Sequence, residues 1–159
     1  MNMEPRLDYR KFSAEPLNAL LSLEKYIAGC GLDHKFVHVL KLRASQLNGC
    51  AFCIDMHSLD ARAAGETEQR LYALDAWRET PFYSERERAA LAWTEALTLI
   101  RKTHAPDDVY EEMRKHFDAE EQVLLTAAIV AINSWNRIAI GFRAVPGAYQ
   151  AAGATRGAA

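Results

Sequence analysis

The hydrophobic residues of this chain recur at helical spacing, and little of the pattern has the strict alternation of a strand. The first repeat spans residues 17–27, where leucines and other apolar residues return every three or four positions. It stops before Gly29, a residue type that often follows the last turn of a helix. Residues 8–16 have no such period, so we expect an irregular arm before the first helix.

A second and a third helix are predicted on either side of a sharp break. Apolar residues repeat over positions 36–47, and Asp33 stands where an N-terminal cap is expected. Asn48-Gly49 is a strong helix breaker. A new helix is therefore predicted to run over residues 50–64 and to end at Gly65.

The middle of the chain continues as helices. We expect one over residues 68–77, interrupted afterwards by Thr80-Pro81. Ser84 and Glu87 have the spacing of a capping box, in which each side chain bonds the other's backbone N–H. They predict the start of an apolar-periodic helix that extends over residues 89–100.

The last helix is the most hydrophobic. A shorter helix is predicted near residues 108–116, and Asp118 with Glu121 repeats the capping box ahead of residues 123–140. This last stretch is apolar nearly all round, which is typical of a central helix. A membrane span is not favoured, because polar side chains interrupt a run already too short to cross a bilayer: Asn133, Asn136 and Arg137.

Together these patterns predict a single all-α domain, a helical bundle with its core over about residues 15–146. Pro146-Gly147 and the Ala- and Gly-rich end predict a flexible tail over residues 147–159. A chain of 159 residues, half of them apolar, is long enough to bury a hydrophobic core.

Composition narrows the possible partners and the compartment. The formal net charge is -2, with basic and acidic residues interspersed, so no nucleic-acid partner is expected. The N-terminus has no apolar stretch after its charges, which predicts a cytoplasmic protein without a secretory signal. We expect neither a membrane partner nor a cofactor.

Cys50, Cys53 and His57 carry the candidate chemistry. Their i+3 and i+4 spacings let the three side chains share one face of a helix. Two thiols at this separation can close a disulfide, and a nearby imidazole stabilises the thiolate, which is the reactive form. In a reducing compartment such a pair is more often catalytic, redox-sensing or metal-binding than structural. Cys30 is then an unpaired thiol.

The spacing suggests a role for each group. His57 lies one turn from Cys53, so we assign Cys53 as the thiol that attacks a peroxide and Cys50 as the thiol that resolves the sulfenic acid, although the two roles could be exchanged. An external dithiol must then reduce the disulfide. If the helices on either side of Asn48-Gly49 fold back on each other, His38 comes within about a turn of His57 and can join a proton relay.

The same residues carry a family resemblance. The run of residues 41–57, KLRASQLNGCAFCIDMH, resembles the core motif of the alkylhydroperoxidase D-like (AhpD-like) proteins, within the carboxymuconolactone decarboxylase superfamily. Similarity continues through residues 65–71, 85–98 and 133–137, and so covers most of the chain. Superfamily members that decarboxylate a lactone lack the paired cysteines, so their presence weighs against that reaction.

The resemblance implies an all-helical fold that assembles into homo-oligomers, commonly trimers or hexamers, and a thiol-dependent peroxidase activity. It also implies that Cys50, Cys53 and His57 occupy the catalytic positions. One position departs from the family pattern, because His38 stands where a relay glutamate is expected. Glu95 and Glu87 are then candidates to supply the missing carboxylate.

Two other functions remain open at this point. Cys50, Cys53 and His57 suit zinc, but a closed structural site needs a fourth ligand, which would be His38 or a residue of another subunit. Alternatively, the dithiol serves sensing or assembly without peroxidase turnover. Of these readings, we expect a peroxidase that takes a hydroperoxide as substrate and binds no metal.

Overall fold

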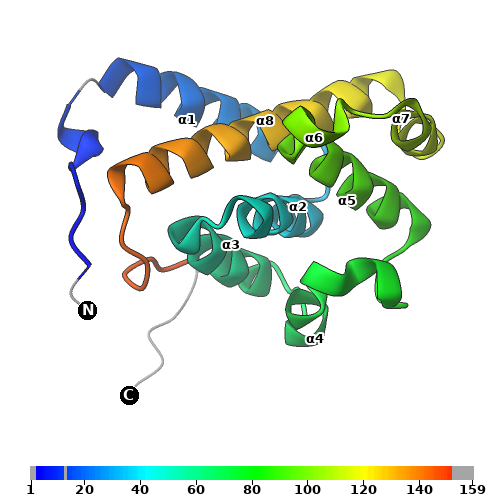
Figure 1. The fold of residues 1–159 in the computed structure, drawn as a ribbon, viewed down its shortest axis with the longest axis horizontal. Coiled ribbons are helices and arrows are strands. Elements are labelled where there is room, and N and C mark those ends of the chain that lie inside the picture. The colour runs from blue at the N-terminus through cyan, green and yellow to red at the C-terminus, as the bar shows by residue number, and fades with distance from the viewer. Residues whose placement is uncertain (1–2, 13, 152–159) are drawn as a thin grey trace.

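The computed structural model describes residues 3–12 and 14–151. Every regular element in these ranges is a helix, as predicted (Figure 1). A short 3-10 helix, η1 (Tyr9–Lys11), precedes the bundle, and a second, η2 (Leu74–Glu79), lies within it. The α-helices are α1 (Ala14–Gly29), α2 (His34–Asn48), α3 (Ala51–Ala63), α4 (Glu68–Tyr72), α5 (Glu85–Thr98), α6 (Ile100–Thr103), α7 (Asp107–Arg114) and α8 (Ala119–Phe142).

The predicted caps form as the sequence indicates. The Asp33 side chain accepts the backbone N–H of Phe36 at 2.9 Å and begins α2. Complete capping boxes begin α5 at Ser84 and α8 at Asp118. The ends of these helices are therefore fixed by short-range hydrogen bonds that sequence spacing alone can identify.

Two boundaries differ from the sequence prediction. Helix α1 begins at Ala14, inside the stretch expected to be irregular, because Pro16 falls in the first turn, where a missing N–H costs no helical hydrogen bond. The single helix expected over residues 68–77 is instead α4 followed by η2. Its buried residues are spaced three apart, at Leu71, Leu74 and Trp77, which suits the three-residue turn of a 3-10 helix.

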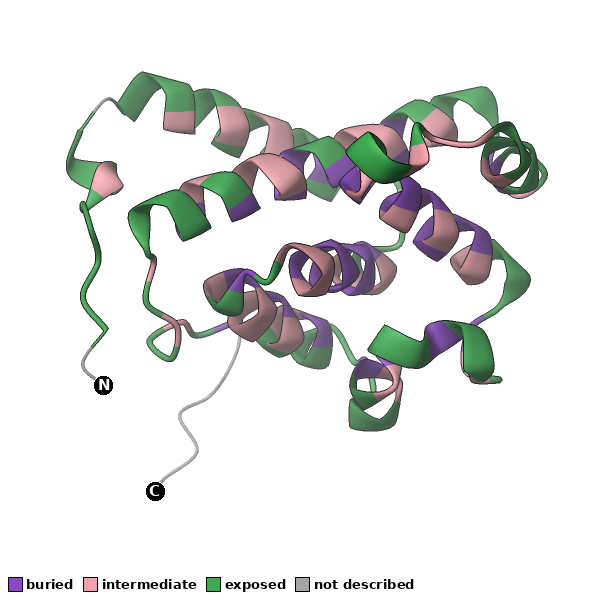
Figure 2. Ribbon diagram, viewed as in Figure 1, coloured by how far each residue is buried: buried purple, intermediate pink, exposed green. Residues whose placement is uncertain are grey.

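Helix α2 forms the centre of the bundle. It packs against α3, α5 and α8, while α1 lies along α8 on the outside (Figure 1). Figure 2 shows the buried residues concentrated in α2, in α5 and on the inward side of α8. More than half of α2 is buried, including two charged side chains, Lys41 and Arg43.

Helix α8, expected to be central, is only partly enclosed. Its inward side is buried against the bundle, but Val123, Val130 and Ile140 are exposed. By length and composition α8 could cross a membrane, and a core helix meets the same criteria. Packing against α1, α2 and α5 accounts for the buried part of its hydrophobicity.

The turn between α2 and α3 is held by side chains of α8. Gly49 ends α2 in the left-handed region, with φ of 68°, which favours glycine. The Asn48 side chain donates to Asn136 Oδ1 at 2.8 Å, and Asn136 in turn donates to Ser45 Oγ at 3.1 Å. Because Asn136 is fully buried, these bonds fix the C-terminal end of α2 against α8 immediately before the cysteine pair.

The segment after α8 differs from the expected flexible tail. The backbone N–H of Gly147 donates to Asp55 at 2.8 Å, and the Tyr149 hydroxyl donates to Asp60 at 2.7 Å. Ala151 is buried. Residues 147–151 therefore pack along α3, because two acidic residues of that helix accept their hydrogen bonds; residues 152–159 lie outside the described part of the chain.

Replacing the buried amide tests the bonds that anchor this turn. We expect Asn136→Ala to lower the free energy of unfolding by about 1 to 3 kcal/mol, because Asn48 and Ser45 lose partners in a buried setting. Urea unfolding followed by circular dichroism measures the change. Ser134→Ala on the same helix is the control, with an expected effect of about 0.5 kcal/mol or less. Equal losses in both variants would contradict this account.

Candidate active site

The two cysteines lie at the start of α3. Their sulfur atoms are at disulfide-bonding distance and their Cα atoms are 5.3 Å apart. Cys50 is the N-cap residue, and its sulfur accepts the backbone N–H of Cys53 at 3.4 Å. Both sulfurs therefore occupy the positive end of a helix, a setting that favours a thiolate once the pair is reduced.

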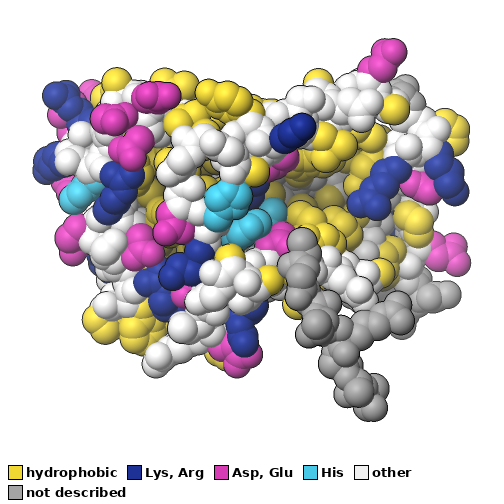
Figure 3. Space-filling view, turned by 180° about the vertical axis from the view of Figure 1, so that it is seen from behind, with side chains coloured by type: hydrophobic (Ala, Val, Ile, Leu, Met, Phe, Trp, Pro, Cys, Tyr) yellow, Lys and Arg dark blue, Asp and Glu magenta, His cyan; other side chains and the backbone are white. Residues whose placement is uncertain are grey.

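A cavity of about 580 Å³ reaches the second cysteine. Cys53 and His57 both line it, one helical turn apart on α3, whereas Cys50 is not among its lining residues. Figure 3 shows histidine side chains beside a hollow with hydrophobic walls. Only 1% of either cysteine is exposed, so this cavity decides which sulfur a small molecule can reach.

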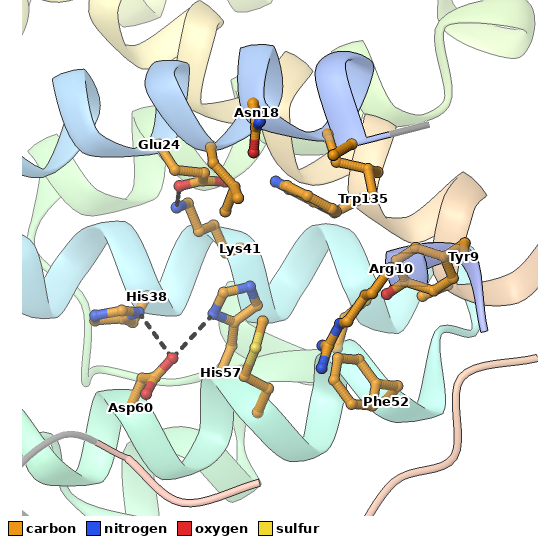
Figure 4. A pocket seen from close by; sticks show the side chains of 16 residues that line it. Tyr9, Arg10, Asn18, Glu24, His38, Lys41, Phe52, His57, Asp60 and Trp135 are labelled. Atoms are coloured by element: carbon orange, nitrogen blue, oxygen red, sulfur yellow. Dashed lines mark hydrogen bonds and ion pairs between the residues drawn. The ribbon is translucent and has the colours of Figure 1, made fainter. Parts of the chain in front are cut away.

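The cavity lies between α1, α2, α3 and α8, and η1 closes one side (Figure 4). Most of its wall is apolar. The larger hydrophobic side chains that line it are Leu17, Leu21, Phe52, Met56 and Trp135. Such a site suits an organic molecule with a small polar reacting group.

His38 lies beside His57, as the fold-back of the two helices predicts. The ring centroids are 5.8 Å apart. Between them stands Asp60, whose Oδ2 is 3.8 Å from Nδ1 of His38 and 3.7 Å from Nδ1 of His57 (Figure 4). Three of the four predicted site residues, Cys53, His57 and His38, therefore line one cavity, and the fourth, Cys50, lies at disulfide-bonding distance from Cys53.

The carboxylate beside the histidines is Asp60, and neither predicted glutamate takes that place. Glu95 accepts hydrogen bonds from Arg43 Nε at 2.8 Å and from Trp77 Nε1 at 2.9 Å, which commits it to the core. Glu87 is part of the capping box of α5. Both lie outside the cavity lining, so the sequence-based expectation for them is wrong.

A sequence signal for Asp60 does exist. It follows His57 by three residues and Cys53 by seven, so all three fall on one face of α3. Its hydrogen bond from Tyr149 has no such signal, because the two residues are 89 positions apart. The same holds for the buried Lys41 on the cavity wall, which pairs with Glu24 of α1.

Cys30, the third cysteine, is separate from this site. It is half-buried after α1, where its thiol donates to the Ile27 carbonyl at 3.1 Å, and it does not line the cavity that reaches Cys53.

Comparison with known proteins agrees with this geometry. The profile of the carboxymuconolactone decarboxylase family matches residues 14–96, more than half of the chain. The chain belongs to this family. It is 46% identical over 138 residues to the uncharacterized protein YdfG of Bacillus subtilis, an alignment that covers 87% of this chain and 94% of YdfG.

Solved structures place the chain among the AhpD-like members of the family. A protein of unknown function from Agrobacterium tumefaciens, proposed to be the antioxidant defence protein AhpD, superposes with a TM-score of 0.88 at 49% identity, over 92% of this chain and all of that one. An AhpD core structure from Ralstonia eutropha, a peroxidase-related protein, has a TM-score of 0.76 over 91% of this chain and 77% of its own. At 17% identity, the similarity to the Ralstonia protein shows a shared fold only.

The charge state of this AhpD-like site follows from its burial. Burial, and then repulsion from His57, lower the pKa of His38 from 6.5 to about 4. Burial also lowers the pKa of His57, and Asp60 only partly offsets that effect. Burial alone would raise the pKa of Asp60, but its contacts with His57 and Tyr149 outweigh burial and lower it. Near pH 7 the site therefore holds two neutral imidazoles and one carboxylate.

This charge state predicts how stability depends on pH. An unfolded His38 binds a proton below about pH 6.5, whereas the folded one does so only near pH 4, so stability is lost as the pH falls through this window. We expect His38→Gln to reduce the proton uptake on unfolding at pH 5 by up to about one proton.

Urea unfolding of both proteins between pH 4.5 and pH 8.5, a range chosen around these values, provides the measurement. Above about pH 7.5 the difference in unfolding free energy between parent and variant should be constant, because His38 is neutral in both states there. If the difference in unfolding free energy between parent and variant neither shrinks nor reverses as the pH falls, the lowered pKa of His38 is contradicted.

Proposed function

We propose that this protein is a thiol-dependent peroxidase that reduces organic hydroperoxides through the Cys50 and Cys53 pair. The observation that carries the proposal is the position of Cys53. Its sulfur is within bonding distance of Cys50 and stands in the wall of a cavity that also holds His57. Membership of the AhpD-like group supports the same activity.

The proposed cycle has three balanced steps. The Cys53 thiolate attacks the distal oxygen of a hydroperoxide, the O–O bond breaks, and the alcohol leaves with one proton while Cys53 becomes a sulfenic acid. The Cys50 thiol then attacks this sulfur, which forms the disulfide and releases water. An external dithiol reduces the disulfide and is itself oxidised.

His57 supplies the base in this scheme. Because its pKa is lowered, it is neutral near pH 7 and can accept the Cys53 proton. Asp60 faces Nδ1 of His57 at 3.7 Å and stabilises the imidazolium that forms. Nucleophile, base and orienting carboxylate follow one another along α3 at positions 53, 57 and 60, and His38 extends the relay from α2.

The cavity wall favours a substrate with an alkyl or aryl group. Leu17 and Leu21 of α1 line the cavity together with Phe52 and Met56 of α3. Burying such a group against these side chains gains roughly 25 cal/mol per Å² of apolar surface. Hydrogen peroxide lacks that surface and should be a poorer substrate.

The proposal includes the partners and the setting of the enzyme. The reductant is a dithiol, and the compartment is the cytoplasm, where disulfides are reduced again after each turnover. We also propose a homo-oligomer, a trimer or hexamer as in the family. The exposed apolar side chains on α8 and α1 support it: Val123, Val130, Ile140, Leu21 and Tyr26.

Single-turnover kinetics of cysteine variants test the assignment of roles. With each protein reduced and cumene hydroperoxide as the probe, we expect Cys53→Ser to abolish consumption. Cys50→Ser should consume one equivalent and accumulate a sulfenic acid on Cys53, because no thiol remains to resolve it. Cys30→Ser is the matched control and should turn over like the parent.

Peroxide consumption measured by a colorimetric assay, with the product identified by mass spectrometry, separates the outcomes. Consumption of the first equivalent by Cys53→Ser but not by Cys50→Ser would exchange the two roles. Consumption by both variants at the parent rate would overturn the proposed function.

A pH profile tests the role of His57. We expect His57→Gln to slow the reaction with cumene hydroperoxide by about 10² to 10⁴ at pH 7, because the thiol loses its base. The deficit should narrow above about pH 8.5, where a cysteine thiol ionises unaided. A deficit equally large at every pH would indicate a structural role only, and it would contradict the proposed base.

A further inference from the structure

Two imidazoles and one carboxylate converge on one point in the cavity wall. One ring nitrogen of His38, one of His57 and a carboxylate oxygen of Asp60 lie within 4.8 Å of one another (Figure 4). Asp60 Oδ2 lies 3.8 Å from Nδ1 of His38 and 3.7 Å from Nδ1 of His57. These distances are too long for N–H to O hydrogen bonds, which span 2.7 to 3.2 Å in general.

The two nitrogens lack other partners. Within residues 3–12 and 14–151, nothing forms a hydrogen bond with Nδ1 of His38 or Nδ1 of His57, although both atoms are buried. Only 6% of the His57 side chain is exposed. Leaving a buried polar atom unpaired costs about 1 to 3 kcal/mol, so the arrangement calls for a group between the three side chains.

We propose that His38, His57 and Asp60 form a binding site for a divalent transition-metal ion of the zinc class. Two imidazoles and one carboxylate are a donor set that zinc accepts, whereas magnesium and calcium prefer oxygen donors alone. Ligand atoms of a tetrahedral zinc ion lie about 3.4 Å apart. The observed separations from Asp60 need to close by only a few tenths of an ångström.

The surroundings of the three residues fit a metal site. Both imidazoles turn Nδ1 toward Asp60 Oδ2 in the cavity wall, and zinc binds an imidazole through such a ring nitrogen. The Tyr149 hydroxyl holds Asp60 Oδ1 at 2.7 Å and leaves Oδ2 facing the imidazoles. A hydrogen bond of this kind orients a ligating carboxylate in metal sites.

This set differs from the zinc site considered from the sequence. That site used Cys50, Cys53 and His57, whereas the present one includes neither cysteine and takes Asp60 instead. Three protein ligands leave the fourth position of a tetrahedral ion for a small molecule in the cavity.

Metal binding has a consequence for the dithiol, and this consequence alone rests on the proposed function. An ion on Nδ1 of His57 uses that lone pair, so the remaining proton stays on Nε2 and the ring can only donate. His57 can then no longer accept the Cys53 proton. Zinc would therefore inhibit peroxide reduction reversibly, and a chelator would restore it.

Zinc binding to a protein without the cysteine pair tests the site directly. In Cys50→Ser/Cys53→Ser, calorimetry should find one equivalent of Zn²⁺ bound. Cobalt(II) in its place should give the visible spectrum of nitrogen and oxygen ligands, without thiolate charge transfer. Adding His38→Gln or Asp60→Asn should weaken binding at least about tenfold, and Tyr149→Phe by about 10 to 100-fold.

Two controls keep the result interpretable. His116→Gln in the same background removes a surface histidine and should leave zinc affinity unchanged. Circular dichroism and thermal unfolding in the presence of a chelator verify that each variant is folded, and a variant that fails this check is replaced by His38→Ala or Asp60→Ser.

The absence of saturable zinc binding to Cys50→Ser/Cys53→Ser would overturn the site, as would binding that survives both His38→Gln and Asp60→Asn unchanged. Because this experiment uses a protein without the dithiol, its outcome is independent of peroxidase activity. That activity is measured separately on the parent protein in the presence of a chelator.

Discussion

The antiparallel packing of α2 against α3 is the constraint on which the site depends. A two-residue turn joins the helices, and Gly49 supplies the left-handed backbone conformation that the turn requires. The turn places Cys50 at the N-cap of α3. It also brings His38 of α2 beside His57 and Asp60 of α3. The buried Asn136 holds the turn against α8, because it accepts a hydrogen bond from Asn48 and donates one to Ser45. A register shift between the two helices would move His38 away from His57 and Asp60.

Burial determines the charge states of the two histidines and influences that of Asp60. The imidazoles stay neutral because a charge inside the bundle is costly, and Asp60 stays ionised because two histidines and Tyr149 surround it. The same low polarity makes the cavity suitable for organic molecules. In the proposed peroxidase, α3 thus supplies the two cysteines. His38 of α2 and Tyr149 of the C-terminal segment help to set the charge state around the base, His57.

The sequence predicts the helices well because their signals are local. Capping residues such as Asp33, Ser84 and Asp118, and the Asn48-Gly49 break, act within a few positions of themselves. The cysteines and His57 are likewise defined by spacing along one helix. Asp60 has the same spacing signal along α3, whereas the family pattern predicts a glutamate as the relay carboxylate. Tyr149 and the pair of Lys41 with Glu24 depend on long-range packing, which periodicity does not encode.

Disulfide mapping of the parent protein tests the central claim most directly. The reduced protein is treated with one equivalent of cumene hydroperoxide, alkylated, digested without reduction and examined by mass spectrometry. The account predicts a peptide that carries an intrachain bond between Cys50 and Cys53, with Cys30 recovered as an alkylated thiol. Recovery of Cys50 and Cys53 as unoxidised thiols, or oxidation confined to Cys30, would contradict it.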